Sequence, residues 1–178
     1  RGVKAAIADH RVAPVDARQI AALATDARVG GMLRGIVGMV VLHVGAASEG
    51  LSHVFEALDR CPYLGRHIIV THINRSPAAF AQAEDLTRRN GFMDVSSGLT
   101  PATLGPDCIK PSHALARALR DGVRPEQILM SSDGYGSAAR YDDHGNVDGL
   151  VASDLHTLAA EFRDLVRQEG LRPEVALL

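Results

Sequence analysis

The sequence has 178 residues, of which 46% are hydrophobic and 22% are charged, and its formal net charge is -2. These values fit a globular chain with enough apolar residues for a core, and they lack the basic excess by which nucleic-acid-binding proteins neutralise phosphates. Aromatic residues make up 4% and tryptophan is absent, so we expect no surface for stacking bases.

The two cysteines and the longest apolar runs bear on where the protein works. Cys61 and Cys108 form neither a CxxC nor a zinc-finger spacing, which is typical of reduced thiols in a cytoplasmic protein. Runs such as GMVVL at 38–42 are too short to span a bilayer, and no secretory signal precedes them. We therefore expect a cytoplasmic protein without membrane contact. Because strand-like sequence begins directly after Arg1, we also expect a piece of a longer chain.

Short apolar runs alternate along the chain with segments of helical periodicity. The runs predict strands at 3–8, 39–45, 67–73, 92–97 and 128–133. A helix is predicted after each of these strands. The first begins at Asp16 and ends before Gly30, the second spans about 51–58, and the third is capped by Ser76 with Pro77 at its first position. The fourth spans about 112–120 and is stopped by Gly122, and the fifth runs from Leu155 to Val166 and is capped by Gly170. Residues 141–149 predict a turn-rich loop before the last helix.

Five strand-then-helix units without an inserted hairpin predict one parallel sheet. Strands joined by helices run parallel, and near-continuous apolar runs indicate that both faces are covered. A doubly wound sheet and part of a (β/α) barrel both have this order. No GxGxxG motif follows the first strand, so a dinucleotide-binding fold has no support. No linker divides the chain, and residues 1–178 are expected to form a single domain or part of one.

Four of the five predicted strands carry a polar residue inside them or at their carboxyl end that suits a metal site: Lys4, His43, His72 and Asp133. Alone, a histidine at a strand end is usually a hydrogen-bonded rim residue, and an aspartate before glycine usually belongs to a turn. In an α/β barrel, however, the carboxyl ends of the strands converge on the active site. Two imidazoles, a carboxylate and one further anionic group suit Zn²⁺ or a similar cation.

Lys4 needs a different explanation, because an ammonium group cannot bind a metal. A buried lysine has a depressed pKa and a reactive free amine, which can form a Schiff base or add CO2 to give a carbamate. The carbamate is anionic, and its two oxygens can bridge two cations. Such a bridge would explain a lysine that stands among apolar neighbours beside histidine ligands.

Two arginines and a serine indicate a substrate with carboxylates. Arg11 and Arg75 lie in predicted loops that leave strand ends, where a guanidinium group can clamp a carboxylate through two hydrogen bonds. Each of them alone is explained equally well as a solvated loop arginine. Ser137 belongs to the segment DGYGS, whose glycines let the backbone approach a ligand closely.

Several segments together resemble the isoaspartyl dipeptidases, which are β-aspartyl peptidases of the amidohydrolase superfamily. These segments are GVKAAIADHR, RVGGML, THINR, SSDGYGS and DDHGNVDGLVASDLHTL, and the similarity runs in order over essentially the whole chain. The resemblance implies a (β/α)8 TIM barrel of the metal-dependent hydrolase type. This chain would supply about strands 4 to 8, as a partial catalytic domain. We further expect a homo-oligomer.

The resemblance also implies how the metal ligands work. Lys4 matches a carboxylated lysine that bridges two zinc ions, and His43 and His72 match the two histidines of the second metal. Asp133 matches the aspartate that binds the first metal and shuttles the proton. A hydroxide that bridges the metals would then hydrolyse the isopeptide bond of a β-aspartyl dipeptide.

For the substrate, the resemblance implies three further contacts. Arg11 and Arg75 match arginines that hold the substrate's carboxylates, and Ser137 matches a serine near its α-amino end. The implied partner is therefore a β-aspartyl dipeptide, with neither nucleic acid nor membrane involved.

The sequence departs from the family pattern in several places. The first metal also needs a His-x-His pair, and no two histidines are two positions apart here. Ala46 stands where an acidic residue is expected, and Tyr135 replaces a smaller polar residue. Two alternatives stay open: a non-catalytic fragment or remnant of such an enzyme, and another amidohydrolase that acts on a cyclic amide.

Overall fold

One five-stranded sheet forms the centre of the computed structural model, which describes residues 2–9, 12–141, 144 and 146–176, with the backbone alone at 137–141 and 151. The strands are β1 (Gly2–Ile7), β2 (Met39–Val44), β3 (Ile68–Thr71), β4 (Phe92–Ser96) and β5 (Ile128–Ser131), and they lie in chain order. Every neighbouring pair is parallel, because each connection contains a helix that returns the chain to the same end of the sheet. The predicted α/β class with a parallel sheet is confirmed.

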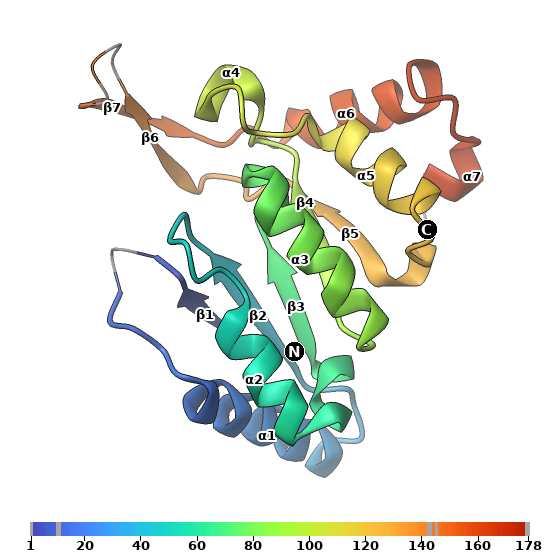
Figure 1. Cartoon of the computed structure of the whole chain (residues 1–178). Coiled ribbons are helices and arrows are strands. Elements are labelled where there is room, and N and C mark those ends of the chain that lie inside the picture. Colours follow the sequence, from blue (N-terminus) through green and yellow to red (C-terminus); the bar gives the residue numbers. More distant parts are fainter. Residues whose placement is uncertain (1, 10–11, 142–143, 145, 177–178) are drawn as a thin grey trace.

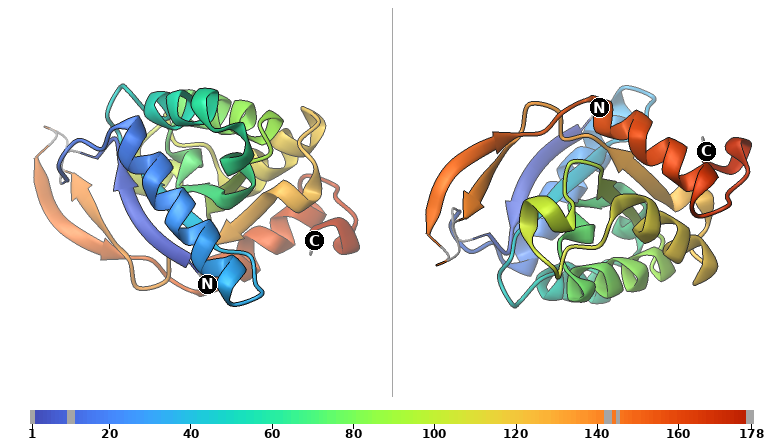
Figure 2. Two further views of the ribbon diagram at one scale, coloured as in Figure 1. Left: turned by 90° about the horizontal axis from the view of Figure 1, so that it is seen from below. Right: turned by 90° about the horizontal axis from the view of Figure 1, so that it is seen from above.

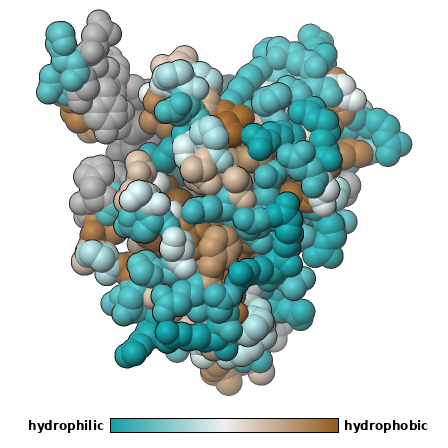
Figure 3. Space-filling view, viewed as in Figure 1, coloured by the Kyte–Doolittle hydropathy of each residue, from teal (hydrophilic) through white to brown (hydrophobic). Residues whose placement is uncertain are grey.

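The longer helices lie along the outer side of this curved sheet (Figures 1 and 2). The helices are α1 (Ala17–Leu33), α2 (Ser52–Arg60), α3 (Pro77–Arg88), α4 (Pro101–Leu104), α5 (Pro111–Arg120), α6 (His156–Arg167) and α7 (Pro173–Ala176). Three 3-10 turns, η1 (Pro62–His67), η2 (Ile73–Arg75) and η3 (Pro125–Gln127), complete the connections. Hydrophilic side chains cover most of the outer face formed by α1, α2 and α3 (Figure 3). None of the described helices is long and apolar enough to cross a membrane.

The outer face of the sheet and the helices over it share one hydrophobic core. On β2, Val40, Leu42 and Val44 are buried against the helices, whereas His43 between them is only partly covered. This alternation is expected because successive side chains of a strand point to opposite faces. Phe80 of α3 belongs to the same core and is fully buried. The inner face of the sheet is therefore the face left for chemistry.

Helix α1 differs from its predicted length. Asp16 caps its start as expected, but the helix continues through Gly30 and Gly31 and ends at Leu33. A Cβ atom on Gly31 would lie 2.3 Å from the backbone nitrogen of Gly38. This glycine therefore allows close packing rather than ending the helix, and Gly35, with φ +65°, follows at the actual end.

A β-hairpin stands between β5 and α6, where the sequence predicts a turn-rich loop and no inserted hairpin. Its strands β6 (Ser137–Tyr141) and β7 (Val147–Ala152) pair with each other in antiparallel fashion, and the hairpin projects from the carboxyl ends of the central strands (Figure 1). The prediction of a loop is wrong because it relied on continuous apolar runs, which mark buried strands. The strands β6 and β7 lack such runs and are held by backbone hydrogen bonds to each other.

Candidate active site

The carboxyl ends of the strands bring the four predicted metal-site residues into one cluster. Lys4 belongs to β1 and His43 to β2, while His72 follows β3 and Asp133 follows β5. The ring centroids of the two histidines are 4.5 Å apart. Asp133 Oδ2 lies 3.9 Å from His72 Nε2, and its Oδ1 lies 3.8 Å from Lys4 Nζ. The sequence thus predicts the neighbours correctly, and their role as metal ligands stays a prediction.

His72 is the most deeply buried member, with 2% of its surface exposed. Its Nδ1 lies 2.6 Å from Ser96 Oγ, whereas its Nε2 is buried and has no hydrogen-bond partner among the described residues. Burial, aided by the neighbouring charge of His43, lowers the pKa of His72 to about 3. The ring is therefore neutral at neutral pH, which is the form that binds metals.

The sequence alone does not single out Asp9, a fifth polar residue of the cluster. It is buried two positions beyond β1, and its Oδ2 lies 3.0 Å from His43 Nε2. A carboxylate at one ring nitrogen orients an imidazole, so that a cation would meet the other nitrogen, Nδ1. The sequence feature that could have identified Asp9 as a site residue is its position in IADHR, just past the end of a predicted strand.

Lys4 is not buried, contrary to the expectation that explains its reactivity. Its side chain is 56% exposed. The reason is its place on β1, which is one of the two edge strands of the five-stranded sheet. In the register of the sheet Lys4 is opposite Val41, on the inner face that the helices do not cover. Its ammonium group instead has Asp133 as an ionic neighbour.

The backbone at these strand ends is strained. Ala8, His72, Asp133 and Tyr135 all have positive φ, at 51°, 67°, 48° and 62°. Conformations of this kind cost roughly 1–3 kcal/mol each and gather at functional sites. Gly136 completes the last turn, because a Cβ there would lie 2.6 Å from Asp133 Oδ2. Glycine is needed at this position for the carboxylate to stay where it is.

The three predicted substrate-binding residues are described to different extents. Arg75 is half-buried at the end of η2, and its charge contributes to the lowered pKa of His72. Ser137 begins β6, and its side chain lies outside the described part of the structure, as does the whole of Arg11. A cavity of about 380 Å³ opens beside His43 and its neighbours on β1. This is room for a small ligand.

The donor set fits a divalent cation only in part. Within the described residues, no three histidine, cysteine, aspartate or glutamate side chains are grouped closely enough to hold a metal ion. Two features nevertheless favour one. The buried Nε2 of His72 has no hydrogen-bond partner among the described residues, and each imidazole is held through its other nitrogen, by Ser96 or Asp9. Imidazoles held in this way are typical of metal ligands.

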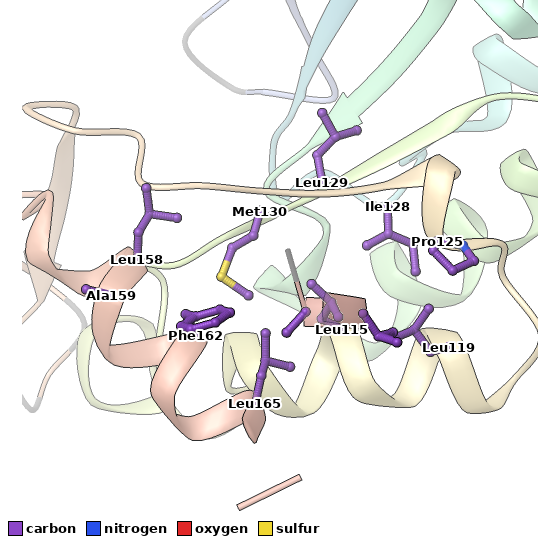
Figure 4. A pocket seen from close by; sticks show the side chains of 12 residues that line it. Leu115, Leu119, Pro125, Ile128, Leu129, Met130, Leu158, Ala159, Phe162 and Leu165 are labelled. Atoms are coloured by element: carbon purple, nitrogen blue, oxygen red, sulfur yellow. The ribbon is translucent and has the colours of Figure 1, made fainter. Parts of the chain in front are cut away.

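A larger cavity of about 500 Å³ lies away from this cluster, between β5 and helices α5, α6 and α7 (Figure 4). Its lining is made of apolar side chains such as Leu115, Met130 and Phe162. Because none of the lining residues can titrate or act as a nucleophile, this cavity offers no chemistry. The cluster at the strand ends is the candidate active site.

Asp94 of β4 lies below the cluster and is buried on the inner face. Thr71 Oγ1 and Ser131 Oγ donate hydrogen bonds to its Oδ2 at 2.5 Å and 2.7 Å. Burial outweighs these bonds and raises the pKa of Asp94 to about 6. The side chain ties β3 and β5 together immediately before the two segments that carry His72 and Asp133.

The raised pKa of Asp94 predicts a pH-dependent stability. Its ordinary value is 3.8, so between about pH 4 and 6 the folded protein keeps a proton that the unfolded chain releases. The resulting stabilisation is present below pH 4 and is lost as the pH rises to 6, by on the order of 3 kcal/mol. Asp94→Asn stays neutral throughout, so its stability relative to the parent is expected to rise over this window. Urea unfolding of both metal-free proteins from pH 4 to 7 measures this, and a constant difference would contradict it.

Comparison with solved structures identifies two close matches, both beta-aspartyl dipeptidases of the thermophilic, keratin-degrading Fervidobacterium islandicum AW-1. One of them, in complex with a beta-Asp-Leu dipeptide, matches 99% of this chain with a TM-score of 0.85 and 30% identity. The other matches 99% with a TM-score of 0.79 and 26% identity. The chain covers 45% and 43% of these two proteins, less than half of each. No protein-family model matches the sequence. The resemblance to β-aspartyl dipeptidases is confirmed.

Proposed function

We propose that this chain supplies part of the active site of a metal-dependent hydrolase that cleaves the isopeptide bond of β-aspartyl dipeptides. The observation that carries the proposal is the cluster of Lys4, His43, His72 and Asp133 at the carboxyl ends of parallel strands. The likeness to two beta-aspartyl dipeptidases, one of them holding beta-Asp-Leu, supports the substrate class. The five strands then correspond to about strands 4 to 8 of an eight-stranded barrel.

The residues proposed to hold two zinc ions are His43, His72, Asp133 and, after carboxylation, Lys4. The Lys4 side chain is 56% exposed, so CO2 can reach it, and carboxylation would require its ammonium group to lose a proton first. His72 would offer its buried Nε2, and His43, whose Nε2 lies 3.0 Å from Asp9 Oδ2, would bind a cation through Nδ1. Zinc ions held by these residues would supply a water molecule of lowered pKa and would polarise the carbonyl group to be attacked.

Asp133 is the proposed carrier of the proton. Its side chain is 34% exposed, so one face meets the solvent and the other meets the cluster. As a general base its carboxylate takes a proton from the attacking water, and as a general acid it donates that proton to the leaving amine nitrogen. Water thereby adds across the isopeptide bond, giving aspartate and the second amino acid.

Recognition of the dipeptide is proposed for Arg75, Arg11 and Ser137. Arg75 is half-buried beside His72, so its guanidinium group is a fixed positive charge next to the reacting bond. A substrate carboxylate bound there would be held through two parallel hydrogen bonds. Arg11 would take the other carboxylate, and Ser137 the α-amino group.

Release of leucine from β-Asp-Leu tests the proposed function. With Zn²⁺ and bicarbonate present, the protein is expected to hydrolyse β-Asp-Leu and to leave α-Asp-Leu intact. Turnover of a cyclic amide such as hydantoin in place of the dipeptide would indicate a different amidohydrolase. Zinc binding without turnover of any of the three would indicate a non-catalytic piece.

A further inference from the structure

The side chain of Asn74 joins three segments around the buried histidine. Its Nδ2 donates to the carbonyl oxygens of Ser96, Leu99 and Ile109 at 3.2 Å, 2.9 Å and 3.2 Å, and its Oδ1 accepts from the backbone nitrogen of Ser96 at 3.0 Å. Asn74 is fully buried. A buried amide that uses both of its ends in this way is fixed in one orientation, and it fixes its partners.

Ser96 is held in place by these bonds on both sides of its backbone. It is the last residue of β4 and is fully buried. From this position its Oγ lies 2.6 Å from Nδ1 of His72. Since Asn74 comes two residues after His72, the contacts form a short closed circuit from the histidine through the amide and the hydroxyl back to the ring.

We infer that Ser96, held by Asn74, is a positioning residue whose Oγ accepts a hydrogen bond from the Nδ1–H of His72 and so turns the Nε2 lone pair toward the cluster. A neutral imidazole has one proton, and placing it on Nδ1 makes Nε2 the acceptor. The inference rests on the proposed function for the identity of the ligand, a divalent cation. Ser96 itself touches neither cation nor substrate.

The alternative is that donor and acceptor are exchanged in the hydrogen bond between Ser96 Oγ and His72 Nδ1. If the Ser96 hydroxyl donates to Nδ1, then Nε2 carries the proton and cannot bind a cation. Ser96 and Asn74 would then only support the packing at the end of β4. The two arrangements differ in the tautomer of His72, which can be measured without any metal.

The first measurement is the ¹⁵N chemical shifts of the His72 ring in the zinc-free protein at neutral pH. The parent is expected to show the Nδ1–H tautomer, and a parent that shows Nε2–H overturns the inference. Ser96→Ala is expected to give a mixture of tautomers, while Ser96→Thr keeps the hydroxyl and the parent's pattern. Because the parent's tautomer needs no variant, this result stands even where Ser96→Ala does not fold.

The second measurement is zinc affinity, by competition with a chromophoric chelator. Ser96→Ala is expected to bind Zn²⁺ roughly 10- to 100-fold more weakly than the parent, the usual loss when a ligand's hydrogen-bond partner is removed. Ser96→Thr is expected to retain the parent's affinity. A folded Ser96→Ala with unchanged affinity and tautomer overturns the inference. A parent that binds no zinc refutes the proposed function instead, and the tautomer still decides the role of Ser96.

Discussion

Replacement of Asp133 by asparagine is expected to lower kcat for β-Asp-Leu hydrolysis by about 100- to 10,000-fold, the usual contribution of a general acid–base group. Asparagine has nearly the same shape and keeps an oxygen that can accept a hydrogen bond. It cannot take up a proton at neutral pH, so the attacking water and the leaving amine both lose their proton carrier. Steady-state kinetics with β-Asp-Leu measure the effect.

The matched control for this change is Asp85→Asn. Asp85 is an exposed aspartate of α3 that pairs with Arg88, far in the fold from the strand ends, and its replacement is expected to leave kcat unchanged. Zinc affinity of Asp133→Asn is measured in parallel, because the same side chain is a proposed ligand. An Asp133→Asn protein that keeps more than a tenth of the parent's kcat would assign the proton transfer to another group.

Replacement of Phe80 by alanine is expected to lower the free energy of unfolding by about 3–5 kcal/mol. Phe80 projects from α3 into the core and is fully buried. The guanidinium carbon of Arg117 on α5 lies 4.8 Å from its ring centroid. Alanine would leave a cavity between α3, the sheet and α5, and would remove this cation–π contact.

Urea unfolding of the zinc-free protein checks this expectation, with Phe80→Leu as the control. Leucine fills most of the space and keeps the apolar contacts, so a smaller loss is expected. The contrast isolates the cavity from the loss of the aromatic ring. A loss below about 1 kcal/mol for Phe80→Ala would mean that the core between α3 and α5 closes over the gap.

The sheet could be predicted because its strands are marked by local sequence. Runs such as IIVT are buried on the outer face and end close to where the apolar residues end. The hairpin β6–β7 could not be predicted, since pairing between its own strands replaces the apolar pattern. The continuation of helix α1 past Gly31 could not be predicted either. Gly31 packs closely against Gly38, and this contact is set by the fold rather than by helix propensity.

The candidate site, like the fold, has one part that could be predicted from the sequence and one part that could not. Strand-end residues could be predicted as neighbours, because parallel strands place all their carboxyl ends at one edge. The partners that orient them could not, since the bond between His72 and Ser96 joins residues 24 positions apart through the register of β3 and β4. The exposure of Lys4 could not be predicted from the sequence either, because the exposure of a residue on an edge strand depends on what lies beside that strand.

The hairpin has a mechanical consequence for the proton carrier. Tyr135 donates its backbone N–H to the carbonyl of Ser153, and Ser153 donates to the carbonyl of Gly136, at 3.0 Å and 2.9 Å. These bonds connect the turn that bears Asp133 to the base of the hairpin. A displacement of β6 and β7 would therefore change the position of the Asp133 carboxylate, although neither strand belongs to the central sheet.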